Sequence, residues 1–352
     1  MCIRDSFKID QITNRVGDAG TQIAGITTFS GTSGMQLPSG PTEYRGGRGR
    51  AIFAGGYEAP ANTKEIQTIE IATTGNATNF GDLPNIRNAQ AATSSSTRGV
   101  IAGGAPVTAE INYTVFSSGG GASHFGKLTV ARRSLSAGGD STRGIWMGGN
   151  TPTRQRTIDY VTLTSTGDAS EFGELGVETG NGSNLNDDMG GCASPIRTFS
   201  FGGGNMSNVI QYVTIQTRGD SQDWGDLSQG NIRFPTGVSN STRALSAGGA
   251  NPSTNGINTI EYFTMASQGN ASNFGDLTVG AARQAGAASA TRGVFAGGYT
   301  WPSPATVYNV INYVTIASTG NAIDFGDLTF AIHTNGASNY FAGTSDVHGG
   351  LG

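Results

Sequence analysis

The sequence Thr291-Arg292-Gly293-Val294-Phe295-Ala296-Gly297-Gly298 is the clearest of six copies of one phrase in this 352-residue chain. Each copy is a short apolar run that ends in Gly-Gly and has an arginine six residues before its last glycine. Successive arginines are 48, 45, 54, 46 and 49 residues apart. A period of this size indicates an array of one supersecondary unit. The six arginines are Arg50, Arg98, Arg143, Arg197, Arg243 and Arg292.

Three further motifs recur in a fixed order around this phrase. After a variable loop comes an alternating segment such as Ile311–Ile316, whose period of two and β-branched and aromatic residues predict a strand. A Gly/Asn turn and an aromatic-Gly-x-Leu motif follow, and a small-residue segment such as Gly286–Ser289 leads to the next arginine. The aromatic positions are Phe80, Phe125, Phe172, Trp224, Phe274 and Phe325.

Four short strands in each repeat of roughly 45–50 residues predict an all-β fold, a β-propeller with four antiparallel strands per blade. We expect the small-residue and Gly-Gly strands nearest the axis, where space is limited. We expect the aromatic residue on the outermost strand to pack between neighbouring blades. No helical period is found in the sequence, so almost no helix is expected.

The two ends of the repeat region decide the number of blades. The first repeat lacks a small-residue segment before Arg50, and one copy is left over after Leu328, at Gly336-Ala337-Ser338-Asn339. We therefore predict six blades and a C-terminal strand that completes the first and closes the circle, since closure removes exposed sheet edges. Phe341-Ala342-Gly343 also echoes the Gly-Gly phrase. It leaves open a seventh blade shared between residues 329–352 and the N-terminal arm.

The order of these motifs resembles the kelch repeat of β-propellers over residues 45–352. The Gly-Gly doublets and the aromatic of the fourth strand carry the resemblance. The spacing and the Thr-Arg before the core strand depart from the kelch pattern, so the chain resembles a divergent, kelch-like family.

Residues 1–44 lie outside the repeats and are interpreted as an N-terminal arm or adaptor. Residues 1–6 match neither the repeats nor a signal peptide, and we interpret them as a non-native leader. Asp10–Arg15 and Gly25–Gly40 resemble N-terminal segments of marine bacteriophage virion and tail-fibre proteins. That resemblance implies a structural or host-recognition role on a virion or an extracellular surface. As an alternative, the arm adds a strand to the sheet edge of a second copy and makes a homo-oligomer.

Composition excludes several classes of function. With 21 basic and 25 acidic residues the net charge is −4, which gives no nucleic-acid footprint. No apolar run reaches the roughly 18 residues of a membrane span. Cys2 and Cys192 do not make a disulfide framework, and the three histidines lack the spacing of metal ligands. We therefore expect no metal, no cofactor and no catalytic residues.

Two sets of residues are candidates for a site. The six repeated arginines could bind an anion, but we expect them to be structural and to pair with a carbonyl or with an aspartate such as Asp82. The loops after the Gly-Gly strands vary most and should share one face. Exposed aromatic residues beside Asn and Ser suit sugar or protein recognition, while packing of these loops on the blade edge is the alternative. The aromatic candidates are Tyr57, Tyr299, Trp301 and Tyr308.

The sequence therefore predicts a non-enzymatic structural or recognition propeller that binds a host glycan or other virion or surface proteins. A carbohydrate-active or oxidase-type propeller is the alternative from another class, and a self-assembling extracellular repeat protein is a third. An enzyme should bring ionisable residues together in the central pocket. The small-residue strands, with Ala, Gly, Ser and Thr, count against that alternative.

Overall fold

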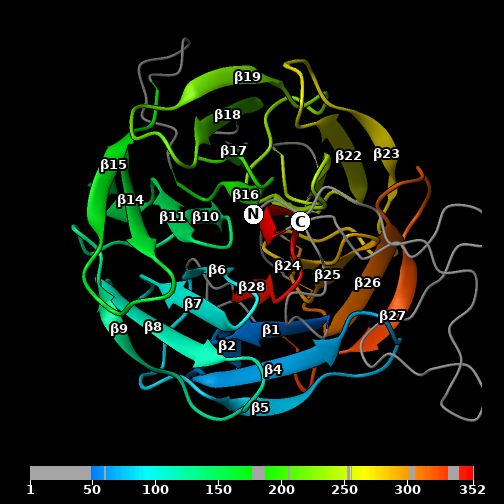
Figure 1. Cartoon of the computed structure of the whole chain (residues 1–352). Coiled ribbons are helices and arrows are strands. Elements are labelled where there is room, and N and C mark those ends of the chain that lie inside the picture. The colour runs from blue at the N-terminus through cyan, green and yellow to red at the C-terminus, as the bar shows by residue number, and fades with distance from the viewer. Residues whose placement is uncertain are drawn as a thin grey trace, which may run out of the picture. The chain divides into compact units, whose positions relative to one another are not determined.

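A computed structural model of the chain describes residues 49–58, 61–176, 187–204, 207–251, 254, 256–300, 306–331 and 341–351. These residues form six four-stranded antiparallel sheets set around a central axis (Figure 1). Within this part of the chain the 3-10 helix η1 (Gly349–Leu351) is the only helix. The predicted six-bladed, all-β propeller is therefore confirmed. The predicted arm, residues 1–44, lies outside the described residues.

Each blade is one sheet, and its four strands are arranged side by side from the axis to the outer edge. From the innermost strand outward, blades 1 to 3 are β28 (Ala342–Ser345), β1 (Arg50–Ala54), β4 (Glu65–Glu70) and β5 (Thr78–Asp82); β6 (Ala91–Ser94), β7 (Arg98–Ala102), β8 (Glu110–Val115) and β9 (Ser123–Lys127); and β10 (Ser136–Gly139), β11 (Arg143–Met147), β14 (Thr157–Thr162) and β15 (Ser170–Glu174). Blades 4 to 6 are β16 (Gly190–Ala193), β17 (Arg197–Phe201), β18 (Val209–Thr214) and β19 (Gln222–Asp226); β20 (Thr236–Ser239), β21 (Arg243–Ala247), β22 (Thr259–Thr264) and β23 (Ser272–Asp276); and β24 (Ala285–Ala288), β25 (Arg292–Ala296), β26 (Val310–Thr315) and β27 (Ile323–Asp327). Two small hairpins lie in the loops of blades 1 and 3, β2 (Tyr57–Glu58) with β3 (Ala61–Asn62) and β12 (Asn150–Thr151) with β13 (Thr153–Arg154).

The C-terminal segment completes blade 1, as the repeat count predicted. β28 pairs antiparallel with β1, with Ala51 opposite Ser345 and Ala54 opposite Ala342. The prediction of which residues form this strand is wrong, however, because the strand is Ala342–Ser345. The segment predicted for it, 336–339, lies outside the described residues.

The echo of the Gly-Gly phrase at Phe341–Gly343 explains that error. Phe341 precedes β28 and packs against Phe53, with the ring centroids 5.8 Å apart. Gly343 pairs with Phe53 in the ladder, as the second residue of an innermost strand does in the other blades. This segment is therefore the innermost strand of blade 1, and the seven-bladed alternative is wrong.

Burial follows the position of each strand in its blade. The second strands have four consecutive buried residues after their arginine, because each lies between two strands of its own sheet and between two neighbouring blades. Large side chains from adjacent blades make the clusters between them; one joins Val100 and Phe125 of blade 2 to Trp146 and Leu163 of blade 3. Burying one such side chain contributes about 1.5–3 kcal/mol. The core is thus a set of layers between blades.

The innermost strands β6, β10, β16, β20, β24 and β28 contact one another in sequence around the axis. Their residues are small because their backbones are close. A Cβ atom on Gly191 would lie 2.6 Å from the carbonyl oxygen of Ala137, and one on Gly237 would collide with the carbonyl of Gly191. The expectation that small-residue strands line the axis is therefore confirmed.

A ring of buried polar side chains on the third strands ties the blades together. Five of them accept a hydrogen bond from the backbone N–H that begins the linker from the preceding blade. For example, Thr329, which follows blade 6, donates its N–H to Gln67 Oε1 of blade 1 at 2.8 Å. The ring is Gln67, Asn112, Asp159, Gln211, Glu261 and Asn312. The same hydrogen bond therefore joins blade 6 to blade 1 as joins four of the five other neighbouring pairs of blades.

Candidate functional site

The antiparallel order gives the propeller two different ends. We call the end that carries the connections from second to third strands, together with the linkers between blades, the loop face. We call the end that carries the two tight turns of each blade the turn face. All six variable loops emerge on the loop face, as the sequence predicted. The repeated arginines begin the second strands and lie at the turn face.

The three aromatic loop candidates that the structure describes do not form an exposed cluster. Tyr299 is only 1% exposed, and its backbone is tied to Ala282 by two hydrogen bonds. Its ring is part of the core, which corrects the expectation that it is exposed. Tyr57 and Tyr308 are half-buried, and Trp301 lies outside the described residues. A ligand-binding role for Tyr57, Trp301 and Tyr308 stays a prediction.

Each repeated arginine donates from its guanidinium to a carbonyl of the following blade. Arg143 Nη1 lies 2.9 Å from Ile215 O, and Arg292 Nη1 lies 2.9 Å from Ile71 O across the closure. Asp82, the suggested carboxylate partner, instead pairs with Lys64 at 3.0 Å. The remaining donor and acceptor pairs are Arg50 to Phe116, Arg98 to Leu163 and Thr164, Arg197 to Met265, and Arg243 to Ile316 and Ala317.

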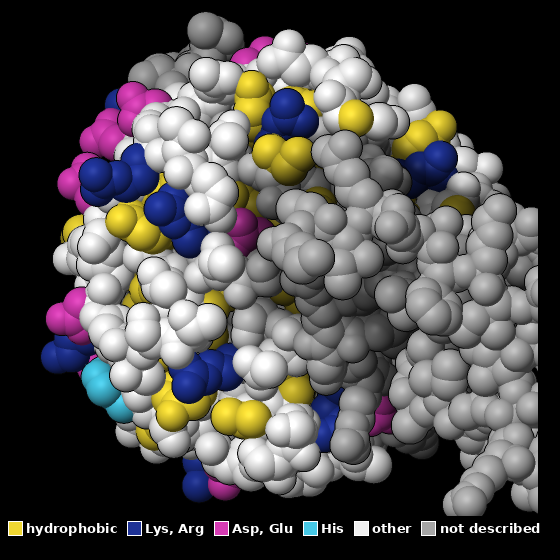
Figure 2. Space-filling model, viewed as in Figure 1, with side chains coloured by type: hydrophobic (Ala, Val, Ile, Leu, Met, Phe, Trp, Pro, Cys, Tyr) yellow, Lys and Arg dark blue, Asp and Glu magenta, His cyan; other side chains and the backbone are white. Residues whose placement is uncertain are grey.

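These arginines also stack on aromatic rings of their own blade. In blade 6, Arg292 lies 4.8 Å from the ring centroid of Tyr313, which meets Phe325 edge to face at 5.8 Å. The same Arg–Tyr–aromatic arrangement recurs in blades 2 to 6. Figure 2 shows Lys and Arg side chains at intervals around the face in view, several of them against hydrophobic side chains. The arginines and the aromatics of the outermost strands thus hold adjacent blades together.

The glycine of the aromatic-Gly-x-Leu motif has a specific steric reason. A Cβ atom on Gly126 of blade 2 would collide with the carbonyl of Gly167, in the turn of blade 3. Gly167 N in turn donates to Phe125 O at 2.8 Å. The motif therefore lets the turn of one blade lie directly on the outermost strand of the blade before it.

A second set of equivalent residues lies at the loop-face end of the central channel. Six described residues that are not glycine have left-handed backbone angles, with φ between 54° and 63°. Five of them, all except Asn231, lie nine residues before a repeated arginine. Such a conformation costs about 1–3 kcal/mol per residue and is often found at functional sites. We call these residues the mouth ring: Ala89, Ser134, Asp188, Phe234 and Arg283.

Backbone hydrogen bonds join the mouth ring from blade to blade. Four of the five N–H groups donate to the carbonyl of the ring residue in the preceding blade. The donor and acceptor pairs are Ser134 to Ala89 at 2.8 Å, Asp188 to Ser134 at 3.0 Å, Phe234 to Asp188 at 3.1 Å and Arg283 to Phe234 at 3.2 Å. Hydrogen bonds between blades therefore hold the left-handed backbone angles in place, and the backbone of the ring is a rigid support for its side chains.

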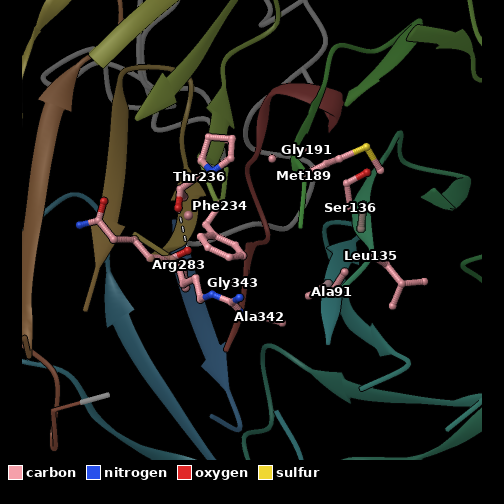
Figure 3. A pocket seen from close by; sticks show the side chains of 18 of the residues that line it. Ala91, Leu135, Ser136, Met189, Gly191, Phe234, Thr236, Arg283, Ala342 and Gly343 are labelled. Atoms are coloured by element: carbon pink, nitrogen blue, oxygen red, sulfur yellow. Dashed lines mark hydrogen bonds between the residues drawn. The ribbon is translucent and has the colours of Figure 1, made fainter. Parts of the chain in front are cut away.

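Three mouth-ring side chains form one stacked and charged group. The guanidinium carbon of Arg283 lies 3.6 Å from the ring centroid of Phe234, and that of Arg233 lies 4.4 Å from the same ring. Asp188 Oδ2 is 2.9 Å from Arg233 Nη2, and its Oδ1 is 3.8 Å from Arg283 Nη2. All but Arg233 are buried. Figure 3 shows Arg283 lying along Phe234 at one side of the cavity.

A second ion pair lies beside this group. Asp187 Oδ1 is 2.7 Å from Arg154 Nε. Burial raises the pKa of the Asp187 carboxyl, and the negative charge of Asp188 raises it further, while Arg154 and Arg233 act in the opposite direction. The mouth thus contains buried ionisable groups in close contact, which the sequence reasoning had not placed in the central pocket.

The sequence reasoning missed Asp188, Phe234 and Arg283 as site residues. None of the three is among the site candidates that the sequence offered. A signal was nevertheless present, because the residue nine positions before each arginine differs in every described repeat. What could not be read from the sequence is that these positions meet at one end of the channel.

Comparison with known proteins adds no assignment. No protein-family model matches the chain, and no curated protein matches it. Among the described residues, no three His, Cys, Asp or Glu side chains are placed to hold a metal ion. In the same part of the chain, no helix has the length and apolar character needed to cross a membrane. The propeller fold itself fits a binding or recognition role.

Proposed function

We propose that this propeller is a non-enzymatic recognition module that binds its partner at the mouth of the channel on the loop face. The observation that carries the proposal is the mouth ring, in which one backbone conformation is repeated five times with five different side chains. Three of these side chains, those of Asp188, Phe234 and Arg283, line the cavity at the mouth. A constant frame with variable side chains is typical of recognition surfaces on rigid scaffolds.

The contrast between the two faces supports this choice. On the turn face the same arginine makes the same type of carbonyl contact in every blade, which is what stability requires. On the loop face the equivalent positions carry methyl, hydroxyl, carboxylate, phenyl and guanidinium groups. Chemical variety at equivalent positions is not needed to repeat a fold, and it is the kind of difference by which ligands are distinguished.

The setting of this activity is also a proposal. The resemblance of Asp10–Arg15 and Gly25–Gly40 to bacteriophage virion and tail-fibre segments supports a virion or extracellular location. The Gly-Gly doublets and the aromatic fourth strands support a divergent, kelch-like relationship. In that setting the partner is a host glycan or another virion or surface protein.

A glycan array probed with the whole chain tests the proposal. We expect a small set of glycans to bind, the signal to be lost in Arg283→Ala, and the signal to be kept in Arg218→Ala. Arg218 is an exposed arginine in a tight turn at the opposite face, so it controls for the loss of one positive charge. Binding that survives Arg283→Ala would place the site elsewhere. Absence of any hit, together with detection of the chain in purified virions by mass spectrometry, would favour a purely structural role.

A further inference from the structure

The channel opens at the mouth ring into a cavity of about 90 Å³. Arg283 and Phe234 lie on one side of this cavity, and Ser136 and Met189 lie on the other (Figure 3). The rest of the lining includes Asp188, the amide side chains of Gln90 and Gln284, and small residues of the innermost strands such as Gly191 and Gly343. The cavity is therefore narrow, with a guanidinium paired to Asp188 on one side and a hydroxyl on the other.

The ion-paired side chains at the mouth carry a net charge opposite in sign to that of the whole chain. Three arginines and two aspartates form two ion-paired groups there, which gives 3 − 2 = +1, whereas the chain carries −4. The five residues are Arg154, Arg233, Arg283, Asp187 and Asp188. Of the five, Arg283 and Asp188 line the cavity itself. A positive group in a narrow, low-dielectric cleft attracts anions, because field lines are focused there.

The geometry of Arg283 selects a planar anion. Its guanidinium is stacked on Phe234 at 3.6 Å, which fixes the plane in which its N–H groups lie. A fixed, planar fork of donors matches a carboxylate, whose two oxygens accept parallel hydrogen bonds. Arg233, on the same phenyl ring and 2.9 Å from Asp188, holds that carboxylate beside the stack.

The wall of the cavity that contains Ser136 favours a ligand that carries hydroxyl groups. The hydroxyl of Ser136 lines the cavity, its residue is only 2% exposed, and it has no hydrogen-bond partner among the described residues. Each innermost strand is also the edge of its sheet, so it leaves backbone N–H and C=O groups outside the ladder. An alkyl acid would leave these groups unsatisfied, at a cost for each buried polar group.

The volume of the cavity limits how much of the ligand can enter it. At roughly 15 Å³ for each water-sized group, 90 Å³ holds about six such groups. That is enough for a carboxylate and the adjoining hydroxyl-bearing carbons, with the rest of the molecule at the loop face.

We propose that the mouth cavity binds the carboxylate end of a sugar acid, with Arg283 holding the carboxylate and Ser136 a hydroxyl. This rests on the proposed recognition function and names its ligand class. A single uronic acid, or one at the end of a glycan chain, offers the same carboxylate and hydroxyls.

The test is a calorimetric or NMR titration of the whole chain with sodium glucuronate and, as the matched neutral sugar, glucose. We expect glucuronate to bind and glucose not to. Arg283→Lys keeps the charge but loses the fork, and Ser136→Ala loses the hydroxyl; each should weaken glucuronate binding by about tenfold, the scale of a charge-assisted or buried hydrogen bond. Arg218→Lys, on the turn face, should leave it unchanged. Thermal unfolding of each variant shows whether it is folded.

The outcomes separate this inference from the recognition function itself. If glucuronate and glucose bind equally, or Arg283→Lys and Arg218→Lys bind glucuronate alike, the ligand class is wrong. Neutral glycans on the array could bind in an Arg283-dependent way while glucuronate fails to bind. That result would support recognition at the mouth and contradict the sugar-acid inference. A peptide with a free C-terminal carboxylate, such as trialanine, that binds more tightly than glucuronate also overturns it.

Discussion

Asp346 accepts the backbone N–H of Arg50 at 2.8 Å, across the closure of the propeller. It also accepts the N–H of Gly49 at 3.1 Å. In the other blades this turn is capped locally, as where Asn240 Oδ1 accepts the N–H groups of Thr242 and Arg243. The C-terminal segment therefore supplies blade 1 with both its innermost strand and its turn cap.

Asp346→Ala should lower the free energy of unfolding by about 1–3 kcal/mol, because two backbone hydrogen bonds lose their acceptor. Asp346→Asn should recover most of this loss, since Asn240 performs the same role in blade 5. Urea denaturation followed by fluorescence measures both. An asparagine variant as unstable as the alanine variant would show that charge, and not capping, is what matters.

Arg243→Ala should lower the free energy of unfolding by about 2–3 kcal/mol. Its Nη1 donates to Ile316 O at 2.9 Å and its guanidinium lies 4.5 Å from the ring centroid of Tyr262, so both a charge-assisted hydrogen bond and a cation–π contact are lost. The exposed Arg218→Ala should stay within about 0.5 kcal/mol of the parent. Equal effects of the two substitutions in denaturant titrations would refute the interblade role.

The buried pair of Arg132 and Asp159 offers a test that uses the repeats as their own controls. The two side chains are fully buried and 2.9 Å apart. Burial lowers the pKa of Arg132, opposed by Asp159. Arg132→Ala should cost about 3–5 kcal/mol, because Asp159 is left as an uncompensated buried charge.

The double variant Arg132→Ala, Asp159→Asn should be more stable than the single one. It copies blade 6, where Ala281 and Asn312 occupy the equivalent positions and are both buried. Chemical denaturation of the two variants under one set of conditions decides the matter. A double variant no more stable than Arg132→Ala would mean that cavity formation, and not charge, dominates the loss.

His348 should make the fold less stable in acid. Its Nε2–H donates to Ser94 O at 2.8 Å and its Nδ1 accepts the N–H of Gly350 at 3.1 Å, so the neutral ring is fully bonded. Burial lowers its pKa below the ordinary 6.5. The unfolded chain therefore takes up a proton before the folded one, and stability is full above pH 6.5 and falls as the pH drops below it.

The measurement is the free energy of unfolding at pH 8 and at pH 5 for the parent and for His348→Gln. We expect a smaller pH-dependent loss in the variant. An identical loss in both proteins would show that other groups govern the acid sensitivity.

Cys192 should not react with thiol reagents in the folded protein. Burial raises the pKa of its thiol to about 12, so almost no thiolate is present at pH 8. In a Cys2→Ser background, Ellman's reagent should label Cys192 only when denaturant is added. Rapid labelling of the folded chain at pH 8 would show that the space between blades 4 and 5 opens.

Much of the fold could be predicted from the sequence because most strands and turns of the repeat have a recognisable local sequence pattern. Alternation marks the strand Val310–Thr315, and Gly-Gly doublets mark the end of each second strand. The closing strand was the exception. Ala342–Ser345 resembles both the small-residue and the Gly-Gly motifs, and only its pairing with β1 distinguishes them.

The site was predicted less well, because a ligand site depends on which residues meet. Tyr299 has the sequence context of an exposed loop aromatic, yet the linker at Ala282 covers it. Arg283 and Asp188 are 95 residues apart in the sequence, yet their side chains lie 3.8 Å apart. No local sequence pattern indicates that two such distant residues form an ion pair.

By itself, the sequence predicted six blades while leaving a seventh open, the type of every blade strand except the closing one, and the common face on which the variable loops emerge. These depend on period, alternation and turn chemistry, which act over a few residues. The tertiary structure alone decided which side chains share the mouth of the channel. Circular closure brings position-equivalent residues of successive blades together, and their left-handed backbones are held by hydrogen bonds that exist only between blades.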